Sequence, residues 1–316
     1  MTIFTRRAIR RATAVMFAGA SLASLGVAAE AKDLTRVGVT VVDLGNPFFG
    51  AIGNAVEAAA KEIAGKNVEV ILASGDYDLN KQSTQFDNFI QAGVDMIIVS
   101  PVDSKAIGAA VERAKAAGIV VVAVDNTALG AQATVTTDNV EAGRQACGYL
   151  AKTLGDKGDV IIINGPAVSG VIDRVKGCHE VLDAKPGVKI LSEEQRPNGT
   201  REGGLTTMSA LLTKFDHVDG VFAINDPQAI GADLAGKQVG RNEFKIVTVD
   251  GSPDIVDALK GNTLVIASSA QLPGQLAKTA LEAGAKLLAG ETLAQPDILV
   301  APSLVTRDNV ADYRGW

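Results

Sequence analysis

Two aspartates stand directly after apolar runs of this 316-residue chain: Asp125 precedes Asn-Thr, and Asp250 precedes Gly-Ser. An ionised carboxylate can accept hydrogen bonds from two neighbouring hydroxyl groups, although an aspartate at such a place also forms Asx-turns and caps. Asn225 and Gln271 each combine a donor with an acceptor, which suits hydroxyl groups of either polarity. Together these residue types favour the binding of a polyhydroxylated molecule.

An aromatic pair, Phe48 and Phe49, follows Asn46-Pro47 in a chain with only 4% aromatic residues. Asparagine followed by proline is typical of a helix start, a role that is compatible with ligand contact. Adjacent helical residues point about 100° apart, so both rings cannot lie at the centre of one buried face. Core packing accounts for Phe48, which continues an apolar helical stripe. We expect an exposed or half-exposed Phe49, suited to stacking on the C–H face of a sugar.

Arg174, within SGVIDRVKG, either donates a fork of hydrogen bonds to a ligand or lies on a solvated helix face. Features of catalysis are scarce. The two histidines, His179 and His217, lie in no nucleophile-base context and are expected at the surface. The sequence also lacks G-x-S-x-G, phosphate-loop, dinucleotide and Cys/His metal patterns. We therefore predict a protein that is not an enzyme and that uses no metal or cofactor.

The elements that must position these residues alternate between apolar runs and helical segments. Continuous Val/Ile runs predict strands covered on both faces, and their alternation with helices predicts parallel βαβ units. The predicted strands are 36–42, 68–73, 96–100, 119–124, 159–164, 188–191, 220–224 and 245–249. The fold class is therefore α/β.

An internal sequence repeat divides the chain into two similar halves. MIIVSPVDSKAIGAA…VVVAVDN resembles VFAINDPQAIGAD…KIVTVDG, in the same order and at nearly the same spacing. This match predicts two similar lobes, each a doubly wound parallel sheet. Ligands bind beyond the carboxyl ends of parallel strands, so two facing lobes would place their polar strand tips around one cleft. Those tips are Asn46, Ser100, Asp125-Asn126, Asn225-Asp226 and Asp250.

The first 31 residues read as an export signal. Four arginines precede an apolar stretch from Ala12 to Val27, and Ala29-Glu30-Ala31 forms an A-x-A cleavage site. The start at Thr5-Arg6-Arg7 keeps both the Sec and the twin-arginine routes open, and a retained membrane anchor is the alternative. We expect a mature protein in the periplasm. The whole chain has a net charge of −6, and removal of residues 1–31, which carry four arginines and one glutamate, leaves about −9. This acidic charge argues against a nucleic-acid partner.

The two cysteines, Cys147 and Cys178, fall on predicted helices of the same half. In an oxidising compartment they could form a disulfide, but two buried free thiols fit the sequence equally well.

From about Leu34 to its end, the chain resembles the periplasmic sugar-binding proteins of the ribose-binding type, which deliver sugars to ABC importers. The matching blocks span both halves in order: GNPFFGAIG, SPVDSKAIG, VAVDN, SGVIDRVKG, FAINDPQAIGA, VTVDGSPD and SAQLPGQLA.

The resemblance implies a type I periplasmic binding protein fold, with two lobes joined by a three-segment hinge. It places the crossings near Thr137-Asp138, Gln271-Leu272 and Val300-Ala301. The N-terminal lobe would comprise 32–137 plus 272–300, and the C-terminal lobe 138–271 plus 301–316. It also implies ligand contacts at Asn46, Phe48, Phe49, Asp125, Arg174, Asn225, Asp250 and Gln271, to which we add Asn126.

Several positions depart from the ribose-binding pattern. Asn126 stands where ribose binders have arginine, and Asn198 is the nearest match to a third stacking phenylalanine. Val249 replaces a phenylalanine and Ser100 an asparagine; we keep Ser100 and Asn198 as lesser candidates. Fewer aromatic walls and one fewer cation weaken the case for ribose and favour a tetritol, a pentitol or another pentose.

The function expected from the sequence is a binding cycle without covalent chemistry. A sugar or polyol docks on one lobe, the other lobe closes by a hinge motion, and the closed form meets the membrane subunits of an ABC permease. We expect a monomer. A ligand-sensing regulator and an exported glycosidase-type enzyme of the same fold remain as alternatives.

Overall fold

The computed structural model describes Met1 and residues 33–316. The predicted export signal and its cleavage site therefore lie outside the described residues, apart from Met1.

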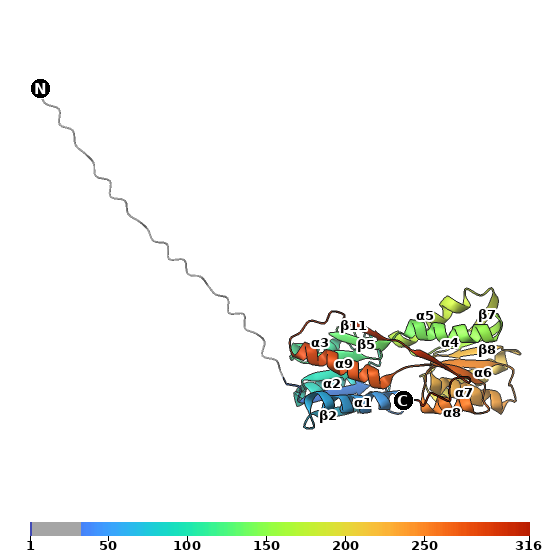
Figure 1. Cartoon of the computed structure of the whole chain (residues 1–316), viewed down its shortest axis with the longest axis horizontal. Coiled ribbons are helices and arrows are strands. Elements are labelled where there is room, and N and C mark those ends of the chain that lie inside the picture. The colour runs from blue at the N-terminus through green and yellow to red at the C-terminus, as the bar shows by residue number, and fades with distance from the viewer. Residues whose placement is uncertain (2–32) are drawn as a thin grey trace. The chain divides into compact units, whose positions relative to one another are not determined.

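The first of two six-stranded sheets runs in the order β11-β5-β4-β3-β1-β2, and all its neighbouring strands are parallel (Figure 1). Its elements are β1 (Arg36–Val41), α1 (Pro47–Ala64), β2 (Glu69–Ser74), α2 (Leu79–Ala92), β3 (Met96–Val99), α3 (Gly108–Ala116), β4 (Val120–Val124), β5 (Ala133–Thr137), α9 (Pro273–Leu288) and β11 (Asp297–Val300).

Helices cover both faces of this sheet. Alternate residues of β3 and β4 pack against α1 and α9 on one face and against α2 and α3 on the other. Val/Ile strands are buried on both sides by this arrangement, which explains why their sequences do not alternate.

The second sheet repeats the pattern in the order β12-β10-β9-β8-β6-β7. Helices α4 and α5 lie on one face, and α6, α7 and α8 on the other. Its elements are α4 (Asn139–Thr153), β6 (Lys157–Ile163), α5 (Ser169–Leu182), β7 (Gly187–Ser192), α6 (Arg201–Lys214), β8 (Gly220–Ala223), α7 (Asp226–Gln238), β9 (Lys245–Asp250), α8 (Pro253–Lys260), β10 (Val265–Ala270) and β12 (Ser303–Thr306).

All eight predicted strands are present, with ends within two residues of those expected. The sequence interpretation missed β5, β10, β11 and β12, which are short or carry several small and polar residues. The predicted parallel sheets are confirmed, with one antiparallel pair at the edge of the second sheet, where β12 pairs with β10. An edge strand entered from the other sheet needs no βαβ crossover, so parallel pairing is not imposed on it.

Helices α4 and α5 cross at close range, and α5 bears Arg174. A Cβ atom added at Gly177 of α5 would overlap the carbonyl oxygen of Val140 on α4. A disulfide joins Cys147 to Cys178 across the same contact, with a Cα–Cα distance of 5.1 Å. Closing a loop with a sequence separation of 31 residues stabilises the fold by about 3–4 kcal/mol in the chain-entropy model.

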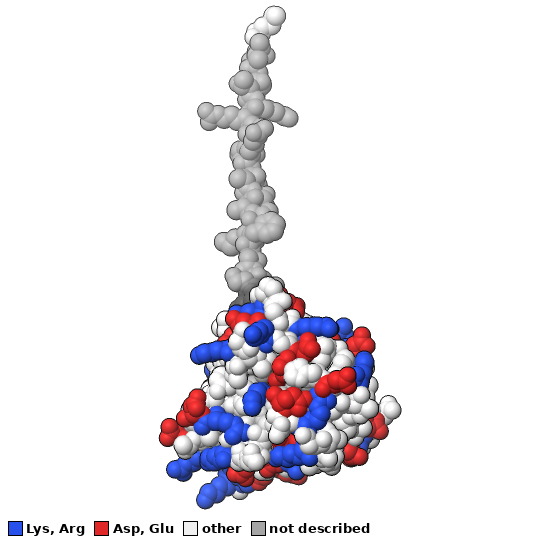
Figure 2. Space-filling model, turned by 90° about the vertical axis from the view of Figure 1, so that its right-hand side faces the viewer, with Lys and Arg blue, Asp and Glu red and all other residues white. Residues whose placement is uncertain are grey.

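Charged side chains of both signs are mixed over the face of the molecule in Figure 2. Among the described helices, none is long and apolar enough to cross a bilayer.

The crossing of α4 and α5 generates a test of the fold. We expect Gly177→Ala to lower the free energy of unfolding by at least about 1–3 kcal/mol, because a methyl group there meets backbone. Gly148→Ala on α4 is the matched control, since nothing lies within 4 Å of its Cβ position. Replacing an open helical glycine should raise stability by up to about 1 kcal/mol. Equal thermal melting temperatures for the two variants would contradict the close crossing.

Candidate functional site

One cavity between the two sheets collects almost all of the side chains that the sequence singled out. Its lining includes Asn46, Phe48, Phe49, Asp125, Asn126, Arg174, Asn198, Asn225, Asp250 and Gln271. Ser100 is the exception: it lies fully buried behind the cavity and donates to Asp125.

The strand order explains why these residues meet. In each sheet the chain reverses its winding direction beside the central strand, between β1 and β3 in the first sheet and between β6 and β8 in the second. Open α/β sheets bind ligands at such switch points, beyond the carboxyl ends of the strands. Asn46 follows β1 and Asn225 follows β8, so each lies at the switch point of its own sheet.

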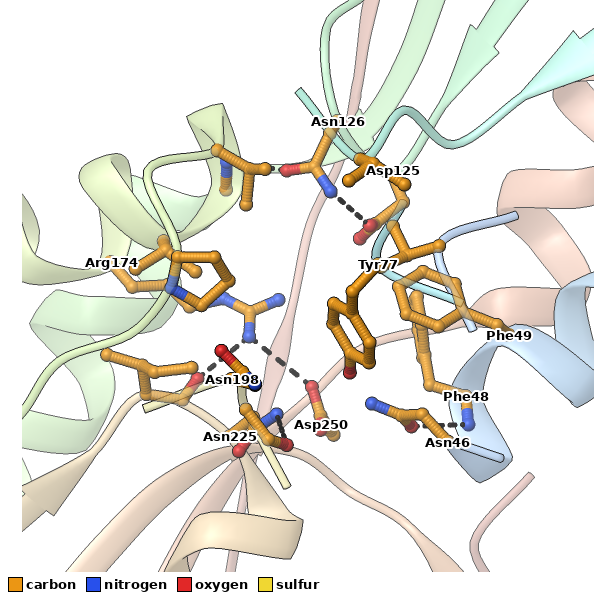
Figure 3. Close-up of a pocket in the computed structure, with 18 of the residues that line it drawn as sticks. Asn46, Phe48, Phe49, Tyr77, Asp125, Asn126, Arg174, Asn198, Asn225 and Asp250 are labelled. Atoms are coloured by element: carbon orange, nitrogen blue, oxygen red, sulfur yellow. Dashed lines mark hydrogen bonds and ion pairs between the residues drawn. The ribbon is translucent and has the colours of Figure 1, made fainter. Parts of the chain in front are cut away.

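Arg174 is the only cation among the lining residues, and it is buried, with 6% of its surface exposed. Its Nε donates to Asn139 Oδ1 (2.8 Å), and its Nη1 donates to the carbonyl of Ile224 (2.8 Å) and to Asp250 Oδ1 (3.4 Å). Figure 3 shows the other terminal nitrogen pointing into the cavity. The alternative of a solvated helix face is wrong, because α5 turns this side chain toward β9.

Asp250 is the last residue of β9 and adopts a φ of 139°, a region that side-chain-bearing residues rarely occupy. Its carboxylate accepts from Gln271 Nε2 (2.8 Å) as well as from Arg174, and its Oδ2 accepts from the backbone N–H of Asp226 (3.3 Å). It caps neither α7 nor α8, whose N-caps are Asn225 and Ser252. The cap reading of Asp250 is therefore wrong.

Asp125 is 5% exposed and also adopts a positive φ, of 69°. Its Oδ2 accepts from Ser100 Oγ (3.2 Å) and from Asn126 Nδ2 (2.6 Å). Among the described residues no cation forms an ion pair with it, and the hydrogen bonds from Ser100 and Asn126 both reach Oδ2. Backbone strain of this kind concentrates at functional sites, which makes Asp125 a strong candidate for ligand contact.

The buried carboxyl groups of the site have raised pKa values. Burial raises the pKa of Asp125 to about 6, although the positive charge of Arg174 acts in the opposite direction. Burial also raises the pKa of Asp250, which Arg174 and Gln271 partly offset. The pKa of Asp226 is raised well above its ordinary value by burial and by the neighbouring negative charge of Asp250. The site therefore holds more carboxyl groups than cations.

The aromatic pair forms one wall of the cavity. Asn46 caps α1 by accepting from the N–H of Phe48 (3.0 Å), and the rings of Phe48 and Phe49 meet edge to face with centroids 5.5 Å apart. The expectation of an exposed Phe49 is wrong, because its side chain is only 8% exposed. Phe49 packs in the apolar cluster of the first sheet and also lines the cavity, which spacing along one helix cannot reveal.

Besides Asn46, three lining amides already have protein partners. Asn126 accepts from the N–H of Gly170 (2.9 Å) and so bonds across to the start of α5. Asn225 caps α7 and donates to Gly199 O (2.8 Å), and Gln271 accepts from Thr137 Oγ1 (2.8 Å). These amides orient the site, whereas Asn46, Asn198 and the charged groups retain more capacity for a ligand.

Sequence reasoning missed Tyr77, which lies in the turn after β2 and points into the cavity (Figure 3). Burial raises its pKa to about 12. The signal was available, because Tyr77 is one of only three tyrosines and lies in the short turn after the predicted strand 68–73. The remaining lining residues are mostly apolar and carry no chemical pattern: Val42, Val102, Pro166, Val168, Gly170, Val171, Gly199 and Ile224.

The cavity offers about 70 Å³ to the centres of water molecules. Since one water needs about 10–15 Å³ by that measure, the cavity has room for roughly five to seven waters. This space suits a small solute and not a polymer. Within the described part of the chain, no group of three or more His, Cys, Asp or Glu side chains is placed to hold a metal ion.

Two doubly wound sheets around a small buried polar cavity are the arrangement of a type I periplasmic binding protein. The family model described as "periplasmic binding protein domain" matches residues 37–292. A xylitol-binding protein from Mycolicibacterium smegmatis is 34% identical over 297 residues, 92% of this chain and 83% of that protein. The ribose import binding protein of Bacillus subtilis is 34% identical over 263 residues, with 82% and 83% of the two chains covered.

Among solved structures, a Caulobacter myo-inositol binding protein with bound myo-inositol superposes with a TM-score of 0.81 at 29% identity, covering 91% of this chain and 98% of that one. The chain therefore belongs to the periplasmic binding proteins, as a ribose-binding-protein-like solute-binding component of an ABC importer. It is an extracytoplasmic, non-enzymatic transport component, and the regulator and glycosidase alternatives are not supported.

The raised pKa of Asp125 generates a test with a defined sign. Between its unfolded pKa of 3.8 and its folded pKa of about 6, the folded protein holds a proton that the unfolded chain lacks. The stability from that proton is complete below about pH 4 and is lost as the pH rises through 6. We expect Asp125→Asn to melt at a higher temperature than the ligand-free wild type at pH 7, and the difference to shrink at pH 5.

Comparing the variant with the wild type at each pH isolates Asp125, because Asp226 and Asp250 shift stability in the same direction in both proteins. A melting difference that does not change between pH 7 and pH 5 would show that the Asp125 carboxyl is not the buried titrating group.

Proposed function

We propose that the chain binds a neutral sugar alcohol or monosaccharide of about five carbons in the cavity between its two sheets. The single observation that carries this proposal is the set of buried charged groups, Arg174, Asp125 and Asp250, around one small cavity with aromatic rings beside it. Carboxylates accept from hydroxyl groups, the guanidinium donates to them, and aromatic rings cover C–H faces.

In this proposal the direct ligand contacts are Asp125, Asp250, Arg174, Asn46 and the rings of Phe48 and Phe49. Tyr77 and Asn198 contribute from the rim, and Ser100, Asn126, Asn225 and Gln271 orient the others. A hydroxyl pattern that leaves one of these buried groups unpaired would cost about 1–3 kcal/mol, which is the source of specificity.

A polyol is favoured over ribose by two of the departures noted in the sequence. Asn126 stands in place of an arginine, and its amide donates to Asp125 and accepts from the N–H of Gly170. This position therefore supplies no cation to a ring oxygen. Asn198 supplies a polar side chain where ribose binders stack a ring. Relatives of comparable similarity are named for xylitol and for ribose. A flexible polyol can place hydroxyl groups against the polar side chain of Asn198.

The lobes in this proposal are 32–137 plus 272–300 and 138–271 plus 301–316, with hinge crossings near Thr137-Asp138, Gln271-Leu272 and Val300-Ala301. Hydrogen bonds between the crossings support it. Thr137 Oγ1 donates to Gln271 Oε1 (2.8 Å), and the N–H of Asp138 donates to the carbonyl of Val300 (2.9 Å). A rotation about three adjacent strands would open the cavity without breaking either sheet.

The cellular setting completes the proposal. A cleaved signal within residues 1–31, read by the Sec or twin-arginine route, would export a monomer that delivers its ligand to the membrane subunits of an ABC permease. We expect no nucleic-acid partner, because the net charge of the whole chain is −6.

Binding of polyols and pentoses tests this function. We expect a thermal-shift panel of tetritols, pentitols, pentoses and inositols to yield a ligand, and calorimetry to give one site per chain. Asp125→Ala and Asp250→Asn should each lose about 10- to 150-fold in affinity, because each removes a charged hydrogen-bond acceptor worth about 1.5–3 kcal/mol.

Asp87→Asn is the control, since it removes only an exposed pair with Arg113 on the outer face of α2. Circular dichroism establishes that all three variants are folded. Full affinity in both site variants, or turnover of the added sugar, would contradict the proposed function.

A further inference from the structure

Residues 307–316, which follow β12, reach back to the ligand cavity through two aromatic side chains. The hydroxyl of Tyr313 donates to the carbonyl of Gly251 (2.8 Å), and the indole Nε1 of Trp316 donates to the carbonyl of Asp250 (2.9 Å). Both carbonyls belong to the turn that ends β9, where Asp250 and Gly251 have positive φ angles of 139° and 78°. The segment therefore holds a strained turn that aims the Asp250 carboxylate.

The same indole contacts the other half of the molecule. The rings of Trp316 and Phe48 meet edge to face with centroids 5.7 Å apart and planes at 74°. Trp316 packs against the apolar cluster of the first sheet, although the strand that leads to it, β12, belongs to the second. Figure 1 draws this end of the chain between α1 and α8.

Trp316 thus joins two groups that line the cavity from opposite sheets, the backbone of Asp250 and the ring of Phe48. It also lines a second hollow, which shares Asn46, Tyr77, Gly199 and Asp250 with the first cavity. In the hinge motion proposed above, Trp316 moves with residues 301–316 of the second lobe, so opening would separate it from Phe48 and closing would restore the contact. Its contact therefore contributes to the closed form and not to either half alone.

We propose that Trp316 is a positioning residue of the ligand site, which couples the Asp250 turn to Phe48 and slows release of the bound ligand. This inference rests on the proposed function and adds a residue that touches no ligand itself. Removing a contact made only in the closed form speeds dissociation more than it slows association.

The test measures binding of xylitol, ribose and myo-inositol to the purified wild-type protein and to three variants. Trp316→Ala should raise Kd by at least about 10-fold, mainly through a faster dissociation rate. Trp316→Phe keeps the ring but loses the N–H, so it should recover part of the affinity. Phe215→Ala is the control: it removes another partly buried ring, packed in the second half away from the cavity lining, and should lower the melting temperature without changing Kd.

An unchanged Kd and dissociation rate in Trp316→Ala would overturn the inference while leaving the proposed function intact. If none of the three probes binds the wild type, quenching of Trp316 fluorescence by acrylamide tests the contact between Trp316 and Phe48 directly. Trp316 is the sole tryptophan, so its signal is unambiguous. Phe48→Ala should about double its quenching in the ligand-free protein, and equal quenching would overturn the inference.

Discussion

The site depends on one guanidinium held out of water between carboxylates. Removing an ion pair from water costs several kcal/mol per ion, and the attraction of the partners offsets this only when the remaining donors and acceptors are also bonded. Arg174 meets that condition at Nε and Nη1 through Asn139, the carbonyl of Ile224 and Asp250, while its other terminal nitrogen points into the cavity (Figure 3). Asp125 does not, since its bonds come only from neutral groups. Hydroxyl groups of a bound solute would supply the missing donors without adding another buried charge.

The fold brings these groups together because the carboxyl ends of parallel strands share one edge of a sheet. Asp125 directly follows β4 and Asp250 is the last residue of β9, and each adopts a backbone conformation that a strand interior would not permit. The α4–α5 crossing, tight enough to require Gly177 and joined by Cys147–Cys178, fixes the helix that carries Arg174. A rigid frame of this kind lets a small movement between the halves open or close the whole site.

Most of the fold could be read from the sequence, because Val/Ile runs and turns act locally. The eight strands were predicted from continuous apolar runs alone. The two similar halves were predicted from the matched order of the repeated sequence blocks. What escaped depended on the other half of the chain. The strand β12 is antiparallel because of where the chain re-enters the second sheet, and Trp316 meets Phe48 from 268 positions away. Tyr77 was missed although its position after a strand indicated it.

The most direct measurement of the central claim is a crystal structure of the protein with the tightest-binding member of a polyol and pentose panel. The account predicts one ligand molecule between the two sheets, with hydroxyl groups within hydrogen-bond distance of both Asp125 and Asp250 and of Arg174, and with a C–H face against an aromatic ring. A ligand bound elsewhere, or one in the cavity whose hydroxyl groups leave both carboxylates unpaired, would contradict it.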